Sequence, residues 1–210
     1  KQFIESHCGI HLESGKEYLI ETRLSDLVLE TGCTSFIEFH EKAKRDDKGE
    51  LRDRIIDAMT TNETLWFRDE SAWTFIKEKE IPELVDKAAS GKKVRIWSGA
   101  ASTGQELYSI LMTLNEELLA KKKTELLDNF EIVGSDISSS ALFLAISGKY
   151  NQMSISRGLP DYFKKKYFTQ SGNVWVFDEN LKKRVKFKRF NLQNDFTPLG
   201  TWDFILCRYV

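Results

Sequence analysis

Four short apolar runs, separated by stretches of helical spacing, constrain the fold of the second half of this chain. Strands that alternate with helices predict an open, mostly parallel α/β sheet. Such sheets bind ligands beyond the carboxyl ends of their strands. The expected strands lie at residues 94–97, 131–136, 185–190 and 202–207, and the expected helices between them include 105–121 and 139–147.

The first 60 residues carry a different pattern, and we expect an all-helical domain there. Ile20, Leu24 and Val28 recur at helical spacing, and a second short helix begins after Ser35. A length of 210 residues suits a small domain joined to a medium-sized one. The expected divisions are a helical domain at 1–60, a linker and connecting helix at 61–90, and a sheet domain at 91–210 with a β-hairpin insertion at about 167–184.

Composition excludes several classes of protein. The 31 basic and 32 acidic residues leave a net charge of -1, which is unlike a globally basic nucleic-acid binder. No apolar run is long enough to cross a bilayer, so we expect no membrane insertion. The three widely spaced cysteines favour a reducing, cytoplasmic location, and we expect no metal site.

Small and acidic residues follow the first two expected strands. The segment 98–106 is rich in Gly, Ala and Ser, which lets a backbone approach a ligand beside the N-terminus of the next helix. Its spacing is neither G-x-G-x-x-G nor that of a phosphate-binding P-loop, so it also fits a plain tight turn. Asp136 closes the second strand, where a carboxylate can accept both hydroxyls of a ribose or cap the following helix.

Polar residues also follow the later strands and fill the linker. Asn191 and the neighbouring Leu192 suit either a purine contact or a simple turn. In the linker, Asn62, Thr64 and Arg68 fall at even offsets, so an extended segment would point all three to one side. An arginine there can bind a carboxylate through two hydrogen bonds, although a plain inter-domain linker is the simpler interpretation.

Together these motifs resemble the chemotaxis-receptor glutamate O-methyltransferases of the CheR type, which use S-adenosylmethionine. The resemblance implies a class I, Rossmann-like methyltransferase sheet preceded by a receptor-facing helical domain. Such sheets have seven strands, so we expect the C-terminal strands to be missing from these 210 residues. The matching segments are Thr60-Thr61-Asn62-Glu63-Thr64, Phe67-Arg68-Asp69, residues 97–106 with Tyr108-Ser109, Gly134-Ser135-Asp136-Ile137, Asn191-Leu192 and residues 204–208.

The resemblance also implies roles for single residues. Arg68 would lie near the methionine carboxylate of the cofactor, Arg208 and Tyr209 would be catalytic at the methyl-transfer site, and Arg23 would face the substrate. The product would be S-adenosylhomocysteine. The residues implied to bind the cofactor are Asn62, Thr64, Arg68, Gly99, Ala100, Glu106, Asp136, Asn191, Leu192 and Arg208.

Some positions depart from the family pattern. Tyr209 stands where the family has Asn, Gln105-Glu106-Leu107 replaces Glu-Glu-Pro, and Ser25-Asp26 replaces basic residues of a helix thought to face the receptor. The turn at residues 171–173 is shorter than the loop of members that bind a tethering peptide. The resemblance implies the helical cytoplasmic region of chemotaxis receptors as partner, and the shorter turn predicts that no tether is used. We expect no nucleic acid as partner.

Charge is uneven along the chain, and other functions share some of these features. Ten basic and three acidic residues between Arg157 and Arg189 give a local charge of +7, which can steer an acidic helix or merely solvate the surface. A nucleic-acid methyltransferase would add a broad basic face and base-stacking aromatics. A dehydrogenase would place an acid about 20 residues after its glycines, whereas Gly99 and Asp136 are 37 apart. A non-catalytic module that senses the cofactor is a further alternative.

Overall fold

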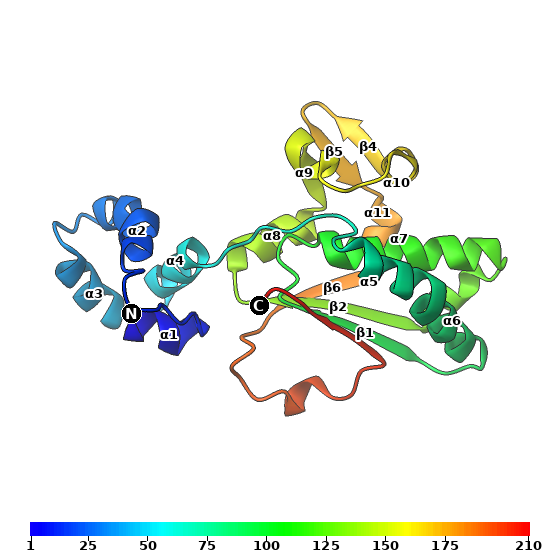
Figure 1. The fold of residues 1–210 in the computed structure, drawn as a ribbon, viewed down its shortest axis with the longest axis horizontal. Helices are drawn as coiled ribbons and strands as arrows, with labels where there is room; N and C mark the ends of the chain where they lie inside the picture. The colour runs from blue at the N-terminus through cyan, green and yellow to red at the C-terminus, as the bar shows by residue number, and fades with distance from the viewer. The chain divides into compact units, whose positions relative to one another are not determined.

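The computed structural model describes residues 1–210, which form two compact units (Figure 1). One unit comprises residues 1–62 together with 137–140. The other comprises residues 63–136 together with 141–210. No helix in either unit has the length and apolar content needed to span a membrane.

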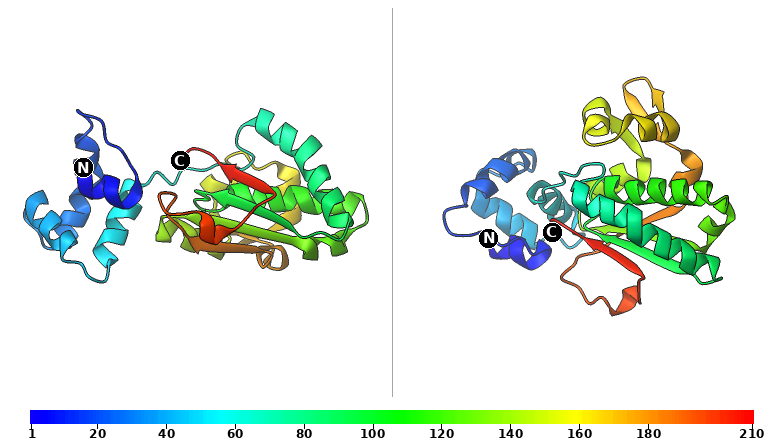
Figure 2. Two further views of the ribbon diagram at one scale, coloured as in Figure 1. Left: turned by 90° about the horizontal axis from the view of Figure 1, so that it is seen from below. Right: turned by 45° about the vertical axis from the view of Figure 1, so that its right-hand side comes forward.

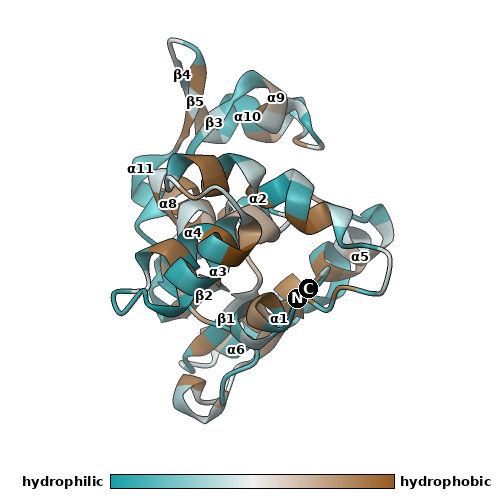
Figure 3. Ribbon diagram, turned by 90° about the vertical axis from the view of Figure 1, so that its left-hand side faces the viewer, coloured by the Kyte–Doolittle hydropathy of each residue, from teal (hydrophilic) through white to brown (hydrophobic).

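The first unit is all-helical, as predicted, and encloses its own core. Ser35 begins α3 by accepting the Glu38 amide at 3.2 Å, while the Glu38 carboxylate accepts the Thr34 amide at 2.8 Å. The helices carry both apolar and polar segments (Figure 3), and Leu24, Phe39 and Met59 are buried between them. The helices are α1 (Gln2–Cys8), which the sequence pattern did not reveal, α2 (Tyr18–Glu30), α3 (Phe36–Lys44) and α4 (Glu50–Met59).

The second unit contains a four-stranded sheet in which every neighbouring pair is parallel, in the order β6-β2-β1-β7. This confirms the predicted open, parallel α/β sheet. At the carboxyl edge, Gly99 lies opposite both Ser135 and Cys207, and Asp136 lies opposite Arg189. The strands are β1 (Val94–Gly99), β2 (Phe130–Asp136), β6 (Val185–Arg189) and β7 (Phe204–Cys207).

Helices cover one face of this sheet and a loop covers the other (Figures 1 and 2). Ile96 on β1 and Leu107 on α7 are completely buried in the helical face. On the other face, Trp97 and Val133 pack against residues of the 190–202 loop. The elements are α5 (Glu70–Phe75), the π-helical η1 (Ile76–Glu80), α6 (Ile81–Ala89), α7 (Gln105–Ala120), the 3-10 helix η2 (Thr124–Asn129), α8 (Ser139–Ser147) and the 3-10 helix η3 (Thr197–Leu199).

A small antiparallel sheet is inserted between α8 and β6. Its strand order is β3-β5-β4, so the hairpin expected near 167–184 is joined by a third strand. Three residues are too few to show strand periodicity, which is why β3 escaped prediction. The elements are β3 (Lys149–Asn151), α9 (Gln152–Ser156), α10 (Asp161–Tyr167), β4 (Phe168–Ser171), β5 (Val174–Phe177) and α11 (Glu179–Lys182).

Candidate functional site

The turn after β1 places a run of small residues at the carboxyl edge of the sheet. Ala100 and Ser102 both have positive φ, at 55° and 49°, so the chain reverses sharply before α7 begins. The amide of Ala101 donates to the carbonyl of Ser135 at 2.9 Å, which fixes the turn to β2. A Cβ on Gly99 would lie 3.4 Å from Cδ2 of Leu192 and 3.7 Å from Sγ of Cys207. The side chains of Trp97, Leu192 and Cys207 therefore pack closely around Gly99.

Asp136 lies at the end of β2 beside this turn. Its Oδ2 accepts the backbone amide of Ser102 at 2.7 Å, and the residue is only 6% exposed. A buried carboxylate is stable only when it has hydrogen-bond donors, and an amide in a tight turn is one such donor. The contact thus joins the ends of β1 and β2. Ser102 was not among the predicted residues, and only its place in the small-residue turn could have suggested it.

The residues after β6 form the turn that the sequence left as an alternative. Oδ1 of Asn191 accepts the amide of Gln193 at 2.9 Å, which is a local side-chain turn. Leu192 lies against the Gly99 position instead, so the structure brings Leu192 and Gly99 together. Their predicted contacts with the cofactor stay predictions.

Glu106 and Arg208 form a polar network at the ends of β1 and β7. Oε1 of Glu106 accepts the Ser98 hydroxyl at 3.0 Å, and its Oε2 lies 2.6 Å from Nη2 of Arg208. The same guanidinium reaches Oδ2 of Asp69 at 2.9 Å and the carbonyl of Arg68 at 3.1 Å. The side chains of Glu106 and Arg208 are 12% and 22% exposed. These contacts hold Arg208 in place, and they include Asp69, which belongs to the matching segment 67–69 but had no predicted role.

The linker departs from the extended shape expected of it. Residues 61–65 have no regular structure, but a turn at Trp66 and Phe67, with φ of 49° at Phe67, interrupts the alternation before Arg68. The cause is Trp66, which is 1% exposed and donates from Nε1 to the carbonyl of Ser154 at 2.9 Å. The segment from Thr64 to Arg68 is therefore not the continuous extended strand that the even offsets assumed.

After this turn, the Arg68 guanidinium lies over the ring of Tyr209. The guanidinium carbon of Arg68 is 3.4 Å from the ring centroid of Tyr209. The Tyr209 hydroxyl donates to Oδ2 of Asp69 at 2.7 Å. The structure thus brings the predicted residues Arg68, Arg208 and Tyr209 into one cluster.

Two of the predicted site residues belong to the helical unit. Arg23 donates to the carbonyl of Met59 and to the Thr61 hydroxyl, the latter at 3.0 Å, so its guanidinium ties α2 to the end of α4. Nδ2 of the Asn62 side chain donates to the hydroxyls of Thr60 and Ser138, each at 3.3 Å. The roles assigned to Arg23 and Asn62 stay predictions.

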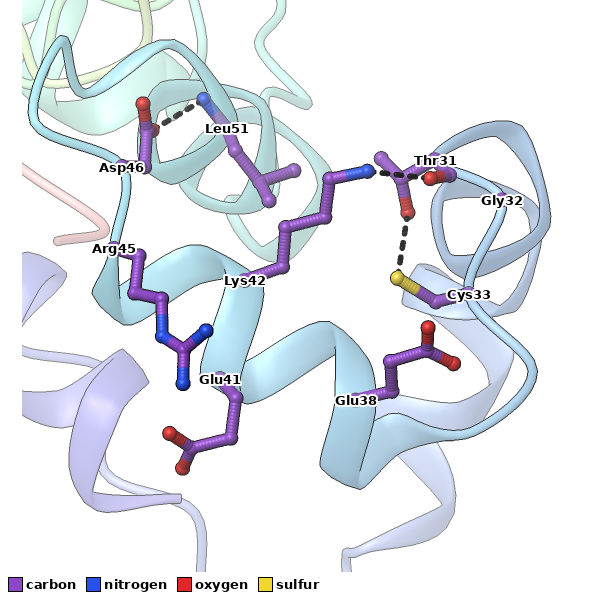
Figure 4. A pocket seen from close by; sticks show the side chains of 9 residues that line it. All are labelled: Thr31, Gly32, Cys33, Glu38, Glu41, Lys42, Arg45, Asp46 and Leu51. Atoms are coloured by element: carbon purple, nitrogen blue, oxygen red, sulfur yellow. Dashed lines mark hydrogen bonds between the residues drawn. The ribbon is translucent and has the colours of Figure 1, made fainter.

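A separate hollow of about 510 Å³ lies within the helical unit (Figure 4). Its polar groups already serve the fold, because Nζ of Lys42 donates to the Thr31 carbonyl at 2.6 Å and Asp46 accepts the Leu51 amide at 2.6 Å. Those are helix-end contacts of α2 and α4. The lining residues are Thr31, Gly32, Cys33, Glu38, Glu41, Lys42, Arg45, Asp46 and Leu51.

The carboxyl edge of the parallel sheet fits a nucleoside cofactor. A backbone turn without bulky side chains, a buried carboxylate and an apolar side chain converge there, on Gly99, Asp136 and Leu192. This donor and acceptor set suits a ribose with an attached base.

Comparison with known proteins identifies both units. Residues 1–60 match the family model "CheR methyltransferase, all-alpha domain", and residues 62–210 match "CheR methyltransferase, SAM binding domain". The chain is 39% identical over 210 residues to the chemotaxis protein methyltransferase of Vibrio anguillarum, covering all of this chain and 74% of that protein. It is 38% identical over 209 residues to chemotaxis protein methyltransferase 1 of Pseudomonas aeruginosa, covering 99% of this chain and 75% of the relative. A chemotaxis protein methyltransferase of Borreliella burgdorferi is 34% identical over 215 aligned residues, covering 100% of this chain and 74% of the relative.

Two family models that together cover nearly the whole chain, and relatives above 30% identity, leave one conclusion. The chain belongs to the CheR methyltransferase family, and S-adenosylmethionine is its methyl donor.

Proposed function

We propose that this protein transfers a methyl group from S-adenosylmethionine to glutamate side chains of chemotaxis receptors and so serves sensory adaptation. The observation that carries the proposal is the match along the whole chain to proteins named chemotaxis protein methyltransferases. The buried carboxylate of Asp136 beside the tight turn of small residues after Gly99 supports it, because a methyltransferase must hold the nucleoside end of its cofactor firmly.

The proposed reaction requires little acid–base catalysis by the protein. A glutamate side chain has an ordinary pKa of about 4.3, so it is ionised at neutral pH and needs no general base. The bound cofactor supplies a sulfonium methyl group that such a carboxylate can attack in line. The protein then contributes by bringing the two groups together, which is worth about 7–11 kcal/mol in favourable cases. Excluding water strengthens the remaining electrostatic interactions.

Within this proposal the chain's own residues divide the work. Asp136 binds the ribose, and Gly99 and Ala100 let the cofactor approach the backbone. Leu192 packs on the adenine side, where Asn191 helps shape the turn. Arg68 binds the methionine carboxylate.

The basic segment 157–189 is proposed to attract the acidic helical substrate. Some of its charges are already paired, such as Lys166 with Glu116 at 2.7 Å and Lys182 with Glu179 at 2.7 Å. Lys164, Lys165, Lys183, Lys186 and Lys188 form no ion pair, so their charges contribute fully to the long-range field. Neutralising Lys182, Lys183 and Arg184 together should flatten the dependence of the methylation rate on ionic strength. A rate that is insensitive to salt in the parent protein would contradict steering.

We also propose that the protein acts in the cytoplasm and without a receptor tether. All three cysteines are free thiols, which suits a reducing compartment. The turn between β4 and β5 is only two residues long, Gly172 and Asn173, and so offers little loop surface to a bound peptide. Binding of a free receptor-tail peptide with micromolar affinity would contradict tether independence.

The decisive experiment is methyl transfer from labelled S-adenosylmethionine. The purified protein is offered a receptor cytoplasmic fragment or total RNA, with an Asp136→Ala variant as control. We expect label on the receptor fragment, released as methanol by mild base because carboxyl methyl esters hydrolyse readily. Label on RNA would favour the nucleic-acid alternative. Binding of S-adenosylhomocysteine with no transfer to either substrate would favour a module that only senses the cofactor.

A further inference from the structure

The end of β7 is fastened to the segment that carries Arg68 by a cluster of short contacts. The Tyr209 ring stacks on the Arg68 guanidinium, with 3.4 Å from the guanidinium carbon to the ring centroid. The Tyr209 hydroxyl and Nη1 of Arg208 both donate to Oδ2 of Asp69, at 2.7 and 2.9 Å. Arg208 also holds the Arg68 carbonyl at 3.1 Å. Every residue of the cluster lies in the sheet unit.

Two residues of the cluster adopt a backbone conformation that is intrinsically unfavourable for residues with a side chain. Asp69 has φ of 67° and Tyr209 has φ of 56°, both in the left-handed region that residues with a Cβ seldom occupy. Aspartate tolerates this region, whereas a bulky tyrosine does so only when its surroundings fix it. The side-chain contacts of Tyr209 provide that fixation.

The stacking leaves Arg68 ready to bind an anion. A guanidinium donates its hydrogen bonds in its own plane, so an aromatic ring on its face leaves those donors available. The structure gives the Arg68 guanidinium no hydrogen-bond or ion-pair partner within the protein. The neighbouring Asp69 is the obvious competitor for Arg68, and its carboxylate is engaged by Tyr209 and Arg208 instead.

We propose that Tyr209 is a positioning residue for Arg68. Its ring fixes the guanidinium plane, and its hydroxyl helps keep Asp69 from neutralising the charge, so that Arg68 presents two donors to the carboxylate of the cofactor's methionine moiety. This inference rests on the proposed function. It assigns Tyr209 a role that acts through Arg68, in place of the catalytic role that the resemblance implied for it.

Two ligands that differ by the amino-acid group separate this role from a general structural one. S-adenosylhomocysteine carries the carboxylate, whereas methylthioadenosine has the same nucleoside and sulfur without it. Calorimetry on Tyr209→Ala should show S-adenosylhomocysteine binding weakened about threefold to tenfold, the range of one cation–π contact. Methylthioadenosine affinity should stay within about twofold of the parent value, because its loss would need a changed nucleoside site.

Matched variants sharpen the test. Tyr209→Trp keeps the stacking ring and should retain most of the affinity for S-adenosylhomocysteine, while Tyr209→Phe loses only the hydroxyl and should fall between Trp and Ala. In an Arg68→Ala background, Tyr209→Ala should have no further effect. The side chain of Tyr209 is largely exposed, at 64% for the residue, so its removal should leave the unfolding temperature nearly unchanged.

Three results would overturn the inference. Unchanged S-adenosylhomocysteine affinity in Tyr209→Ala would show that the ring does not act on Arg68. Equal weakening of both ligands would show a structural role. Binding of neither ligand by the parent protein would refute the proposed cofactor site itself. This failure is distinguished from failure of the Tyr209 inference because it is seen in the parent protein, before any variant is compared.

Discussion

Replacing Asp136 by alanine or by asparagine should separate its contribution to folding stability from its contribution to cofactor binding. In the fold, Oδ2 accepts the amide of Ser102 at 2.7 Å, and Ser102 itself is 8% exposed. Alanine would leave that buried amide without this acceptor, at a cost of about 1–3 kcal/mol. In a domain of this size, 2 kcal/mol corresponds to roughly 4–8 °C in the unfolding temperature. Asparagine keeps an oxygen acceptor and should lose much less.

Cofactor binding should respond differently to the same two changes. A carboxylate that accepts two ribose hydroxyls makes two charge-assisted hydrogen bonds, each worth about 1.5–3 kcal/mol. Asp136→Ala should therefore raise the dissociation constant for S-adenosylhomocysteine by about 10² to 10⁴. Asp136→Asn should raise it by about tenfold or more, because the amide has no charge and turns a donor toward a hydroxyl.

Calorimetry gives the affinity, and thermal unfolding followed by circular dichroism gives the stability. Asp161→Asn, at an exposed position of the same unit, is the matched control and should change neither. The reasoning would be refuted if both Asp136 variants bound S-adenosylhomocysteine as the parent does. Equal destabilisation by alanine and asparagine would show that the Ser102 amide contact is not the source of the stability effect.

Three further outcomes test the interactions that stabilise the sheet unit. A Cβ on Gly158, where φ is 91°, would lie 2.4 Å from the Trp66 carbonyl, so Gly158→Ala should destabilise the sheet unit far more than Gly172→Ala, where φ is 59° and no atom lies within 4 Å; similar urea midpoints for the two would contradict this. Trp66→Ala should lower the free energy of unfolding by about 3–5 kcal/mol, and a loss below 1 kcal/mol in urea titrations would show that the side chain is not a core anchor. Burial opposes ionisation of Glu116, but hydrogen bonds from Lys166 and two tyrosines outweigh it and lower the pKa of that carboxyl. The stability that this ionised group contributes is present above about pH 4.3 and is lost as the pH falls through the lowered pKa, so Glu116→Gln should reduce the acid sensitivity of the unfolding temperature, and an unchanged pH profile would count against it.

Local sequence pattern predicted the elements that are long and periodic. The helix expected at 105–121 and the parallel strands appear where the apolar spacing placed them. The strand-end rule also led to Asp136, because its position follows from where β2 stops. Helix α1 and strand β3 escaped because seven and three residues carry too little periodicity.

Local sequence patterns could not predict the side-chain networks. Arg208 meets Glu106 across 102 positions of sequence and Asp69 across 139, and no spacing rule connects residues so far apart. The prediction of an extended linker was wrong for a related reason. Burial of Trp66 among aromatic residues of the inserted sheet overrides the extended alternation that the linker would otherwise follow.

The aromatic packing of Trp66 has a consequence for how the sheet unit unfolds. Trp66, Tyr150 and Phe168 belong to the same continuous hydrophobic cluster as Ile96 and Leu107 of the main sheet and α7. The two sheets therefore share one core and should open as a single cooperative unit. Slowly exchanging amides in β5 should then show the same opening free energy as those in β1. The inserted sheet is therefore not an independent module that can be deleted or grafted, because its removal would expose the core of the sheet unit to water.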